Sequence, residues 1–225
     1  MRRVHTDREY AEHLRGVGER LRRMTGAVQE MLRDGVQALV EGDKRLALST
    51  IQRDRAVNRL ELEIDELCVL ILARWQPVAS DLRFVTTALK LVTDLERVGD
   101  LASNIAERVL ELSDGPFVWD REAFMHMSEV VQGMVGDATG AFVERDEEQA
   151  RAVIERDDEA DARYQQLLQG VIDVMKARPE LVHDGVHVQA VAKWLERVAD
   201  HATNVAEQTI FLVRGKDVRH GPLPR

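Results

Sequence analysis

The sequence is poor in the residues that build sheets, tight turns and disulfides. Only 4% of its 225 residues are aromatic, and it contains 14 glycines, 5 prolines and a single cysteine. So few aromatic residues and helix breakers favour long helices over sheets. One cysteine excludes a disulfide within the chain, which fits a cytoplasmic protein. Cys68 lies in the apolar run 67–73, where we expect a core residue.

Long apolar runs are also missing. The run 67–73 is far shorter than the roughly 20 residues that span a bilayer, so no direct membrane span is predicted. No apolar stretch follows Arg2 and Arg3, so we expect no signal peptide. The formal net charge is −9. An acidic chain repels phosphate backbones, which argues against a nucleic-acid partner and favours cations.

Apolar residues recur at three- and four-residue steps over most of the chain, which predicts helices. Short breaks, such as Gly42-Asp43 with Asp43 as a helix N-cap, divide the pattern. Ser113-Asp114-Gly115-Pro116 is the clearest break and the predicted domain boundary. We expect six helices, which end near residues 41, 74, 112, 144, 176 and 213 and begin near residues 7, 43, 78, 119, 146 and 184.

A segment of the chain occurs twice. Leu95-Glu96-Arg97-Val98-Gly99-Asp100-Leu101-Ala102-Ser103-Asn104-Ile105-Ala106-Glu107 returns 100 residues later, from Leu195 to Glu207, with nine of thirteen positions identical. Upstream, a shift of 103 residues aligns Ile51-Gln52-Arg53-Asp54 with Ile154-Glu155-Arg156-Asp157. The predicted fold is therefore all-α, with two tandem three-helix bundles over residues 7–112 and 119–213 and a loose C-terminal tail over 214–225.

The repeat carries rows of acidic residues at one-turn spacing. Both arms of a helical hairpin rise about 1.5 Å per residue, so residues equally far from the turn lie at equal height. Asp54 and Asp100 are equally far from Pro77, as are Asn58 and Glu96. In the second bundle, the turn beside Pro179 places Asp157 level with Asp200 and Asp161 level with Glu196 in the same way. We therefore expect two acidic rows to face each other in each bundle.

Facing carboxylates repel, and a hard divalent or trivalent cation with oxygen ligands relieves that repulsion. Fe, Mn or Mg fits this donor set better than Zn, because there are no cysteine clusters and the histidines are scattered. His201, next to Asp200, is a candidate to face the same site. Tighter binding is expected in the second bundle, since Asp161 replaces Asn58. The predicted metal ligands are Asp54, Asn58, Glu96, Asp100, Asn104, Asp157, Asp161, Glu196, Asp200 and Asn204.

These rows also have a simpler interpretation. An isolated Glu-x-x-x-Asp on a helix is usually a solvated face, and Arg97 or Arg197 is placed to pair with it. A purely structural helical scaffold without metal is therefore an alternative. A carboxylate-bridged metal enzyme of ferritin-like type needs paired Glu-x-x-His motifs. Only Glu180-Leu181-Val182-His183 matches, beside the turn at Pro179, and no nucleophile–base set is evident. We expect a protein that is not an enzyme.

The doubled Leu-Glu-Arg-Val-(Gly/Ala)-Asp-x-Ala-(Ser/Thr)-Asn motif, with the upstream Asp54 and Asp157 rows, resembles the PhoU family of phosphate-signalling proteins. The resemblance runs from about Tyr10 to Val213. It implies two lobes of three helices and four (Glu/Asp)-x-x-x-Asp motifs, which hold multinuclear iron or other metals in some members. Here these motifs are Asp54 to Asn58, Glu96 to Asp100, Asp157 to Asp161 and Glu196 to Asp200, and the first departs by ending in Asn.

The resemblance also implies a role. PhoU proteins repress the phosphate-starvation response and phosphate uptake when phosphate is plentiful. They link the ATPase subunit of a phosphate ABC transporter to a sensor histidine kinase. They are cytoplasmic, associate with the membrane through these partners, and often form homodimers. Each of these properties is an expectation for this chain that comes from the resemblance alone.

Overall fold

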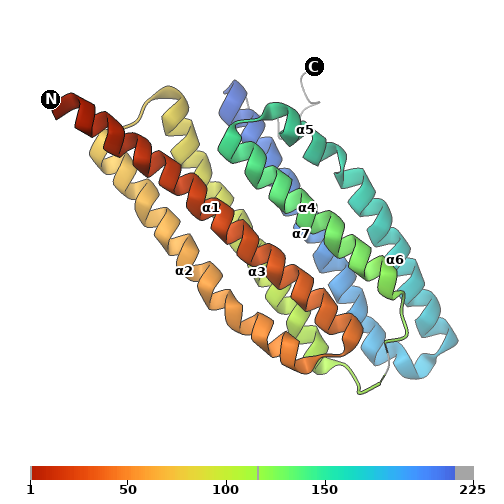
Figure 1. Cartoon of the computed structure of the whole chain (residues 1–225). Helices are drawn as coiled ribbons and strands as arrows, with labels where there is room; N and C mark the ends of the chain where they lie inside the picture. Colours follow the sequence, from red (N-terminus) through yellow and green to blue (C-terminus); the bar gives the residue numbers. More distant parts are fainter. Residues whose placement is uncertain (1, 116, 216–225) are drawn as a thin grey trace.

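The computed structural model describes residues 2–115 and 117–215, and within these residues the chain is helical apart from short connections. Figure 1 shows two sets of nearly parallel rods side by side. The helices are α1 (Arg2–Glu41), α2 (Lys44–Trp75), α3 (Ala79–Glu111), α4 (Arg121–Glu144), α5 (Glu147–Glu155), α6 (Asp157–Ala177) and α7 (Val182–Arg214), with the 3₁₀ turn η1 (Pro179–Leu181) before α7. The predicted all-α fold is confirmed.

The helix ends follow the local chemistry of the sequence. Asp43 is the N-cap of α2, as predicted, and its side chain accepts hydrogen bonds from the backbone N–H groups of Arg45 and Leu46. Gln76 ends the same helix in the left-handed conformation, with φ of 46°. Gly215 ends α7 with φ of 69°, which costs glycine no steric strain. From residue 216 onward, the predicted loose tail lies outside the described residues.

The fifth predicted helix is wrong as a single element. The structure breaks it at Arg156, between α5 and α6. The Arg156 guanidinium lies 2.7 Å from Asp137 of α4, and its backbone N–H bonds to Val153 O, three residues back, instead of continuing the α-helical ladder. Neither glycine nor proline marks this position, so the sequence carries no signal for the break. The repeat-related Arg53 forms the same pair with Asp34 while α2 continues unbroken, so this pairing alone does not account for the break.

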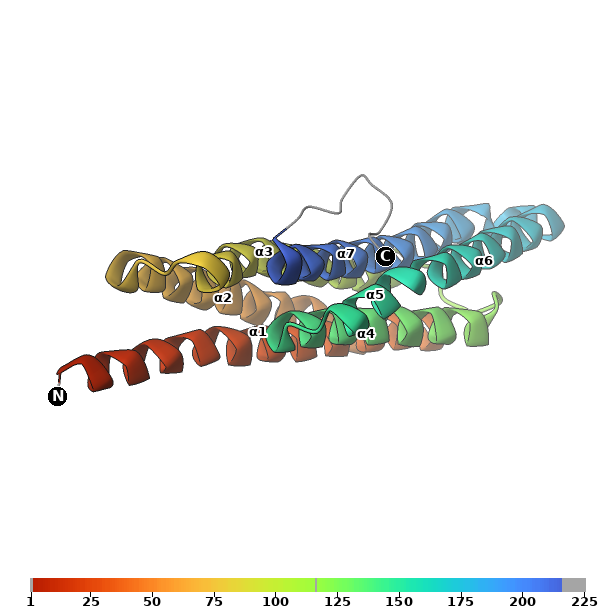
Figure 2. The same ribbon diagram turned by 90° about the horizontal axis from the view of Figure 1, so that it is seen from above.

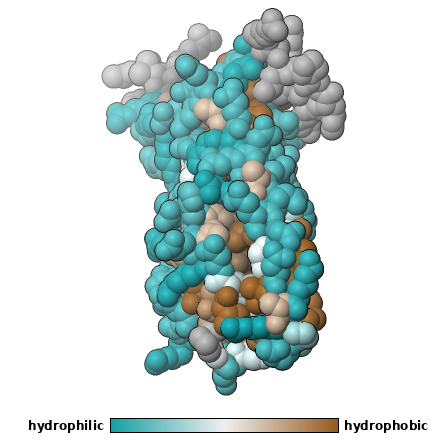
Figure 3. Space-filling view, turned by 90° about the vertical axis from the view of Figure 1, so that its right-hand side faces the viewer, coloured by the Kyte–Doolittle hydropathy of each residue, from teal (hydrophilic) through white to brown (hydrophobic). Residues whose placement is uncertain are grey.

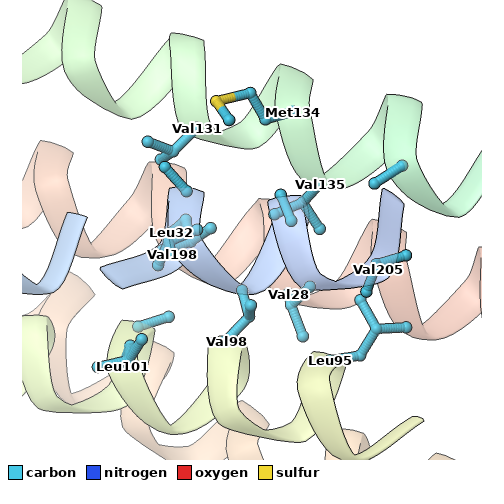
Figure 4. Close-up of a cluster of buried hydrophobic side chains, with 14 of the residues drawn as sticks. Val28, Leu32, Leu95, Val98, Leu101, Val131, Met134, Val135, Val198 and Val205 are labelled. Atoms are coloured by element: carbon cyan, nitrogen blue, oxygen red, sulfur yellow. The ribbon is translucent and has the colours of Figure 1, made fainter. Parts of the chain in front are cut away.

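Each half of the chain forms an antiparallel bundle. In lobe one, α1, α2 and α3 pack on one another, and in lobe two, α4 packs on α5, α6 and α7. The lobes pack through α1 against α4 and α3 against α7, and Figure 2 shows these pairs in two layers, with the lobes displaced along the long axis. Val28 and Leu32, Leu95 and Val98, Val131 and Met134, and Val198 and Val205 interdigitate there, one pair from each of four helices (Figure 4).

The interface between the lobes follows the repeat. Gln29 of α1 and Gln132 of α4 occupy equivalent positions 103 residues apart, and Gln29 Nε2 donates to the Gln132 carbonyl at 2.8 Å. Thr25 donates to Thr139 nearby, at 2.9 Å. Equivalent residues that meet in this way define a local two-fold relation between the lobes. Both interfaces therefore bury one continuous core that neither lobe could cover alone.

Two further expectations can be compared with this fold. Cys68 is fully buried in the core, as predicted. Among residues 2–115 and 117–215, the helices all lack the length or the apolarity needed to cross a bilayer.

Candidate metal centres

The α2–α3 hairpin brings the predicted acidic rows of lobe one together. Burial raises the pKa of Asp54, and the Asp100 carboxylate on the neighbouring helix raises it further, against a hydrogen bond from Asn58. Burial raises the pKa of Glu96 most, and the charge of Asp100 raises it further. Asp54 makes a smaller contribution in the same direction. These interactions place Asp54 of α2 opposite the row on α3, as the equal distances from Pro77 predicted. Like charges held this close destabilise each other.

Two oxygens in this lobe lack hydrogen-bond partners. Asn58 Nδ2 donates to Asp54 Oδ2 at 2.9 Å. The second oxygen of that carboxylate, Asp54 Oδ1, and the amide oxygen Asn58 Oδ1 are buried and accept no hydrogen bond. A buried acceptor without a partner costs about 1–3 kcal/mol. A cation between α2 and α3 would supply what both oxygens lack.

Glu61 and Asp65 extend the acidic face of α2 toward the hairpin turn, and the predicted ligand set did not contain them. Burial raises the pKa of Glu61, with further contributions from Asp65 and Asp100. Asp54, Asn58, Glu61 and Asp65 follow one another at steps of three or four residues, so all four lie on one face of α2. This spacing is the sequence signal that could have identified Glu61 and Asp65. Arg97 lies at the exposed rim, 3.1 Å from Asp100 and 3.5 Å from Glu96.

Lobe two repeats the arrangement between α6 and α7. Burial raises the pKa of Asp157, and the charges of Asp161 and Glu196 add to this, against a hydrogen bond from Thr203 at 3.2 Å. Burial raises the pKa of Asp200 as well, followed by the charges of Glu196 and Asp157. All four predicted carboxylates of this lobe therefore interact across the helix pair. The break at Arg156 makes Asp157 the first residue of α6, where the helix dipole favours its charge.

A lysine distinguishes lobe two from lobe one. Lys193 Nζ lies 2.7 Å from both carboxylate oxygens of Glu196 and 5.1 Å from the ring centroid of Tyr164. The repeat-related positions in lobe one hold Thr93 and Glu61. Lobe two therefore already has an ammonium group against a largely buried carboxylate of its acidic row, whereas lobe one has an additional carboxylate. The motif comparison did not reveal this difference, because it lies outside the matched segments.

The remaining predicted ligands take different positions. Asn104 is half-buried and Asn204 exposed, and neither hydrogen-bonds to an acidic row within the described residues. His201 does not face the site of lobe two. Its Nδ1 lies 2.9 Å from Asp94 Oδ1 on α3, while Gln208 Nε2 donates to Asp94 Oδ2 at 3.0 Å. His201 therefore belongs to the interface between lobes, because its direction depends on how α7 packs on α3.

The acidic rows are close but not arranged as ready coordination spheres. Within the described parts of the chain, no three His, Cys, Asp or Glu side chains converge as the ligands of one ion. The donor chemistry nevertheless fits a hard cation, since carboxylate and amide oxygens dominate and two of those in lobe one are buried without hydrogen-bond partners. Side-chain rotation would have to bring these oxygens together around an ion.

The geometry and the repeat can be compared with known proteins. The family model for the PhoU domain matches residues 21–109 and, a second time, residues 124–209. The chain belongs to the PhoU family. Its two lobes correspond to the two PhoU domains, so the fold class and the family expected from the doubled motif are both confirmed.

Individual PhoU proteins support this assignment over nearly the full length. The phosphate-specific transport system accessory protein PhoU homolog of Pseudomonas aeruginosa is 38% identical over 222 residues, 98% of this chain and 92% of the relative. The crystal structure of PhoU from the same organism superposes with a TM-score of 0.86 at 37% identity, covering 92% of this chain and 100% of that one. The phosphate transport system regulatory protein PhoU from Streptococcus pneumoniae gives a TM-score of 0.85 at 29% identity, covering 93% and 99%.

These matches also exclude one of the alternatives that the sequence left open. PhoU is a family of accessory and regulatory proteins of phosphate transport, and it is not enzymatic. The ferritin-like enzyme is therefore excluded.

Proposed function

We propose that this protein is a negative regulator of the phosphate-starvation response and of phosphate uptake. It acts as a metal-binding adaptor between the ATPase subunit of a phosphate ABC transporter and a sensor histidine kinase. The observation that carries the proposal is the double PhoU-domain match, in a chain that holds facing carboxylate rows in both lobes. The working form is a homodimer in the cytoplasm, which reaches the membrane through its partners.

The metal part of the proposal rests on the residues of each helix pair. In lobe one, Asp54, Asn58, Glu96 and Asp100 would hold an Fe, Mn or Mg ion, and Asn104 extends the row. In lobe two, Asp157, Asp161, Glu196 and Asp200 would do the same, with Asn204 one turn further along α7. Bound there, a cation neutralises the repulsion between the rows. The residues of each row then hold α2 against α3, or α6 against α7, and stiffen the surface that partners read.

A reporter assay tests the regulatory role. A phosphate-dependent reporter is measured in a strain that lacks this gene, with and without the wild-type gene restored. We expect constitutive expression in the deletion strain and renewed repression at high phosphate on complementation. Normal repression without the gene would contradict the proposal. A Glu196→Ala/Asp200→Ala variant that loses metal but still represses would show that metal and regulation are not coupled.

A purely structural scaffold is the second candidate, and one observation favours it. Within the described residues, the carboxylates do not converge around a common point. Metal analysis of protein purified without chelator, followed by thermal unfolding with and without Mn²⁺ or Fe²⁺, separates the two. An ion that binds only the folded state raises the melting temperature. An unchanged melting temperature supports the scaffold.

A further inference from the structure

A cavity of about 300 Å³ lies where the two lobes are joined. Its wall contains the α1–α2 turn, the segment that connects α3 to α4, and the α6–α7 turn, which all lie at the lower end of the molecule in Figure 1. Apolar side chains form much of the wall, namely Leu39, Val109, Leu112, Phe117, Val118 and Leu181. Apolar side chains also gather on the surface at this end (Figure 3). The volume matches the lower range of small-molecule pockets.

The two carboxylates in the wall are already bonded to neighbouring groups. Asp184 is 8% exposed, and its Oδ1 accepts hydrogen bonds from Ser113 N at 3.2 Å and Ser113 Oγ at 3.0 Å, with His183 Nδ1 at 3.3 Å. Asp114 Oδ1 accepts from Lys44 Nζ at 2.9 Å. Both carboxylates of the wall therefore already have donors without a ligand.

Two donor groups in the same wall have no partner among the described side chains, and one of them is buried. Trp119 is 8% exposed, and its indole Nε1–H is buried without a hydrogen-bond partner. Buried donors are nearly always paired, so this group indicates a missing acceptor. Arg178 is exposed at the rim of the cavity, and its guanidinium forms no hydrogen bond or ion pair with another described side chain. The uncommitted groups of the cavity are thus one neutral donor and one cation, set in an apolar wall.

We propose that this cavity binds a small amphipathic anion, with an apolar body against the leucine and valine side chains and a carboxylate or similar acceptor toward Trp119 and Arg178. Such a ligand contacts residues of both lobes and of their connection at once. It therefore favours one arrangement of the lobes, independently of the ions at the acidic rows. None of the predicted metal ligands lines this cavity, so the two ligands do not compete for side chains.

NMR of the indole N–H groups tests this proposal directly. The chain has three tryptophans, so Trp119 can be assigned with a Trp119→Phe variant, and Trp75 and Trp194 serve as internal controls. Octanoate is titrated into the full-length protein with EDTA present, which removes any contribution of metal. We expect a saturable downfield shift of the Trp119 indole proton, as a new hydrogen bond produces, and little change at the other two.

Matched variants and probes complete the experiment. Arg178→Gln should weaken octanoate binding about tenfold through loss of a charge-assisted hydrogen bond, while Arg59→Gln, at an exposed arginine of α2, should leave it unchanged. Leu181→Phe should reduce binding by filling the cavity. Inorganic phosphate at the same concentration should not shift Trp119. Equal shifts at all three indoles, equal affinity in both arginine variants, or an equal response to phosphate would each overturn the proposal.

Discussion

Arg53 Nη1 lies 2.6 Å from Asp34 Oδ2 in lobe one, and the repeat-related Arg156 and Asp137 form the same pair at 2.7 Å in lobe two. The two pairs differ in burial. The Asp34 side chain is 12% exposed and that of Asp137 is 47% exposed. The same contact therefore has different consequences in the two lobes, although the residues are identical.

Removal of the arginine should cost more in lobe one. We expect Arg53→Met to lower the free energy of unfolding by about 1–3 kcal/mol, because it removes a partner from a buried carboxylate. Arg156→Met should cost less than about 1 kcal/mol, because its partner is solvated. Urea unfolding of both variants measures the difference. A larger loss for Arg156→Met would mean that the break between α5 and α6 matters more than burial of the acid.

The ammonium group of Lys193 should weaken metal binding in lobe two. Lys193→Thr, which introduces the residue found at the equivalent position 93, should tighten Mn²⁺ binding there about tenfold, equivalent to about 1.4 kcal/mol. Calorimetric titration in a Glu96→Gln/Asp100→Asn background isolates this lobe. Lys176→Thr, at a lysine on α6 that is 70% exposed, is the control. Equal affinities in the two variants would rule out competition by Lys193.

The difference between Asn58 and Asp161 gives a separate test of the ligand rows. The sequence predicts that lobe two binds metal more tightly, because Asp161 carries a charge where Asn58 does not. Asn58→Asp should then raise metal occupancy in lobe one, and Asp161→Asn should lower it in lobe two, as measured by metal analysis after dialysis. Unchanged occupancy in both variants would show that these positions are not ligands.

The raised pKa values of the acidic rows predict how stability changes with pH. Burial, with neighbouring carboxylates, raises the pKa of Asp54 and Asp157 in the folded protein. As the pH falls through these raised values, the folded state takes up protons before the unfolded chain does, so the rows destabilise the protein less. Their contribution is therefore least favourable above the raised pKa values.

An Asp54→Asn/Asp157→Asn variant should accordingly gain stability over the wild type at pH 7 and lose that advantage toward about pH 4, near the ordinary pKa of aspartate. Melting temperatures measured without metal across this range provide the comparison. Asp173→Asn, at an aspartate that is 61% exposed, serves as the control. A double variant that follows the wild-type curve at every pH would contradict the shifts.

The shared core predicts that the lobes unfold together. Leu32→Ala, at a fully buried position between the lobes, should destabilise the protein by about 2–5 kcal/mol. Leu62→Ala, at a position 62% exposed, should cost less than about 0.5 kcal/mol. Fluorescence of Trp75 in lobe one and Trp194 in lobe two should report one coincident urea transition. Two separate transitions would show that the lobes are independent domains.

Much of this architecture could be predicted from the sequence, because it depends on local rules. Apolar periodicity located the helices, and Asp43 marked a cap that the structure contains. Equal distance from Pro77 placed Asp54 against the α3 row without any tertiary information. These predictions succeed where chain connectivity alone determines which groups meet.

The remaining features depend on contacts between lobes or on single substitutions. The break at Arg156 has no counterpart in α2, where Arg53 forms the equivalent pair with Asp34, so neither the sequence nor this pairing predicts it. His201 turns toward Asp94 because α7 packs on α3, and helical periodicity does not specify which lobe a polar residue contacts. Lys193 reaches Glu196 on its own helix, yet its effect on the site becomes apparent only when Thr93 is seen at the equivalent position.

The meeting of Gln29 with Gln132 has an evolutionary consequence. Two separate copies of a half-length chain, joined about such an axis, would always carry every substitution twice. Fusion into one polypeptide lifts that constraint, so Glu61 and Thr93 in one half could diverge from Tyr164 and Lys193 in the other. A covalently linked pair can thus place different side chains at equivalent positions of halves that still share one fold.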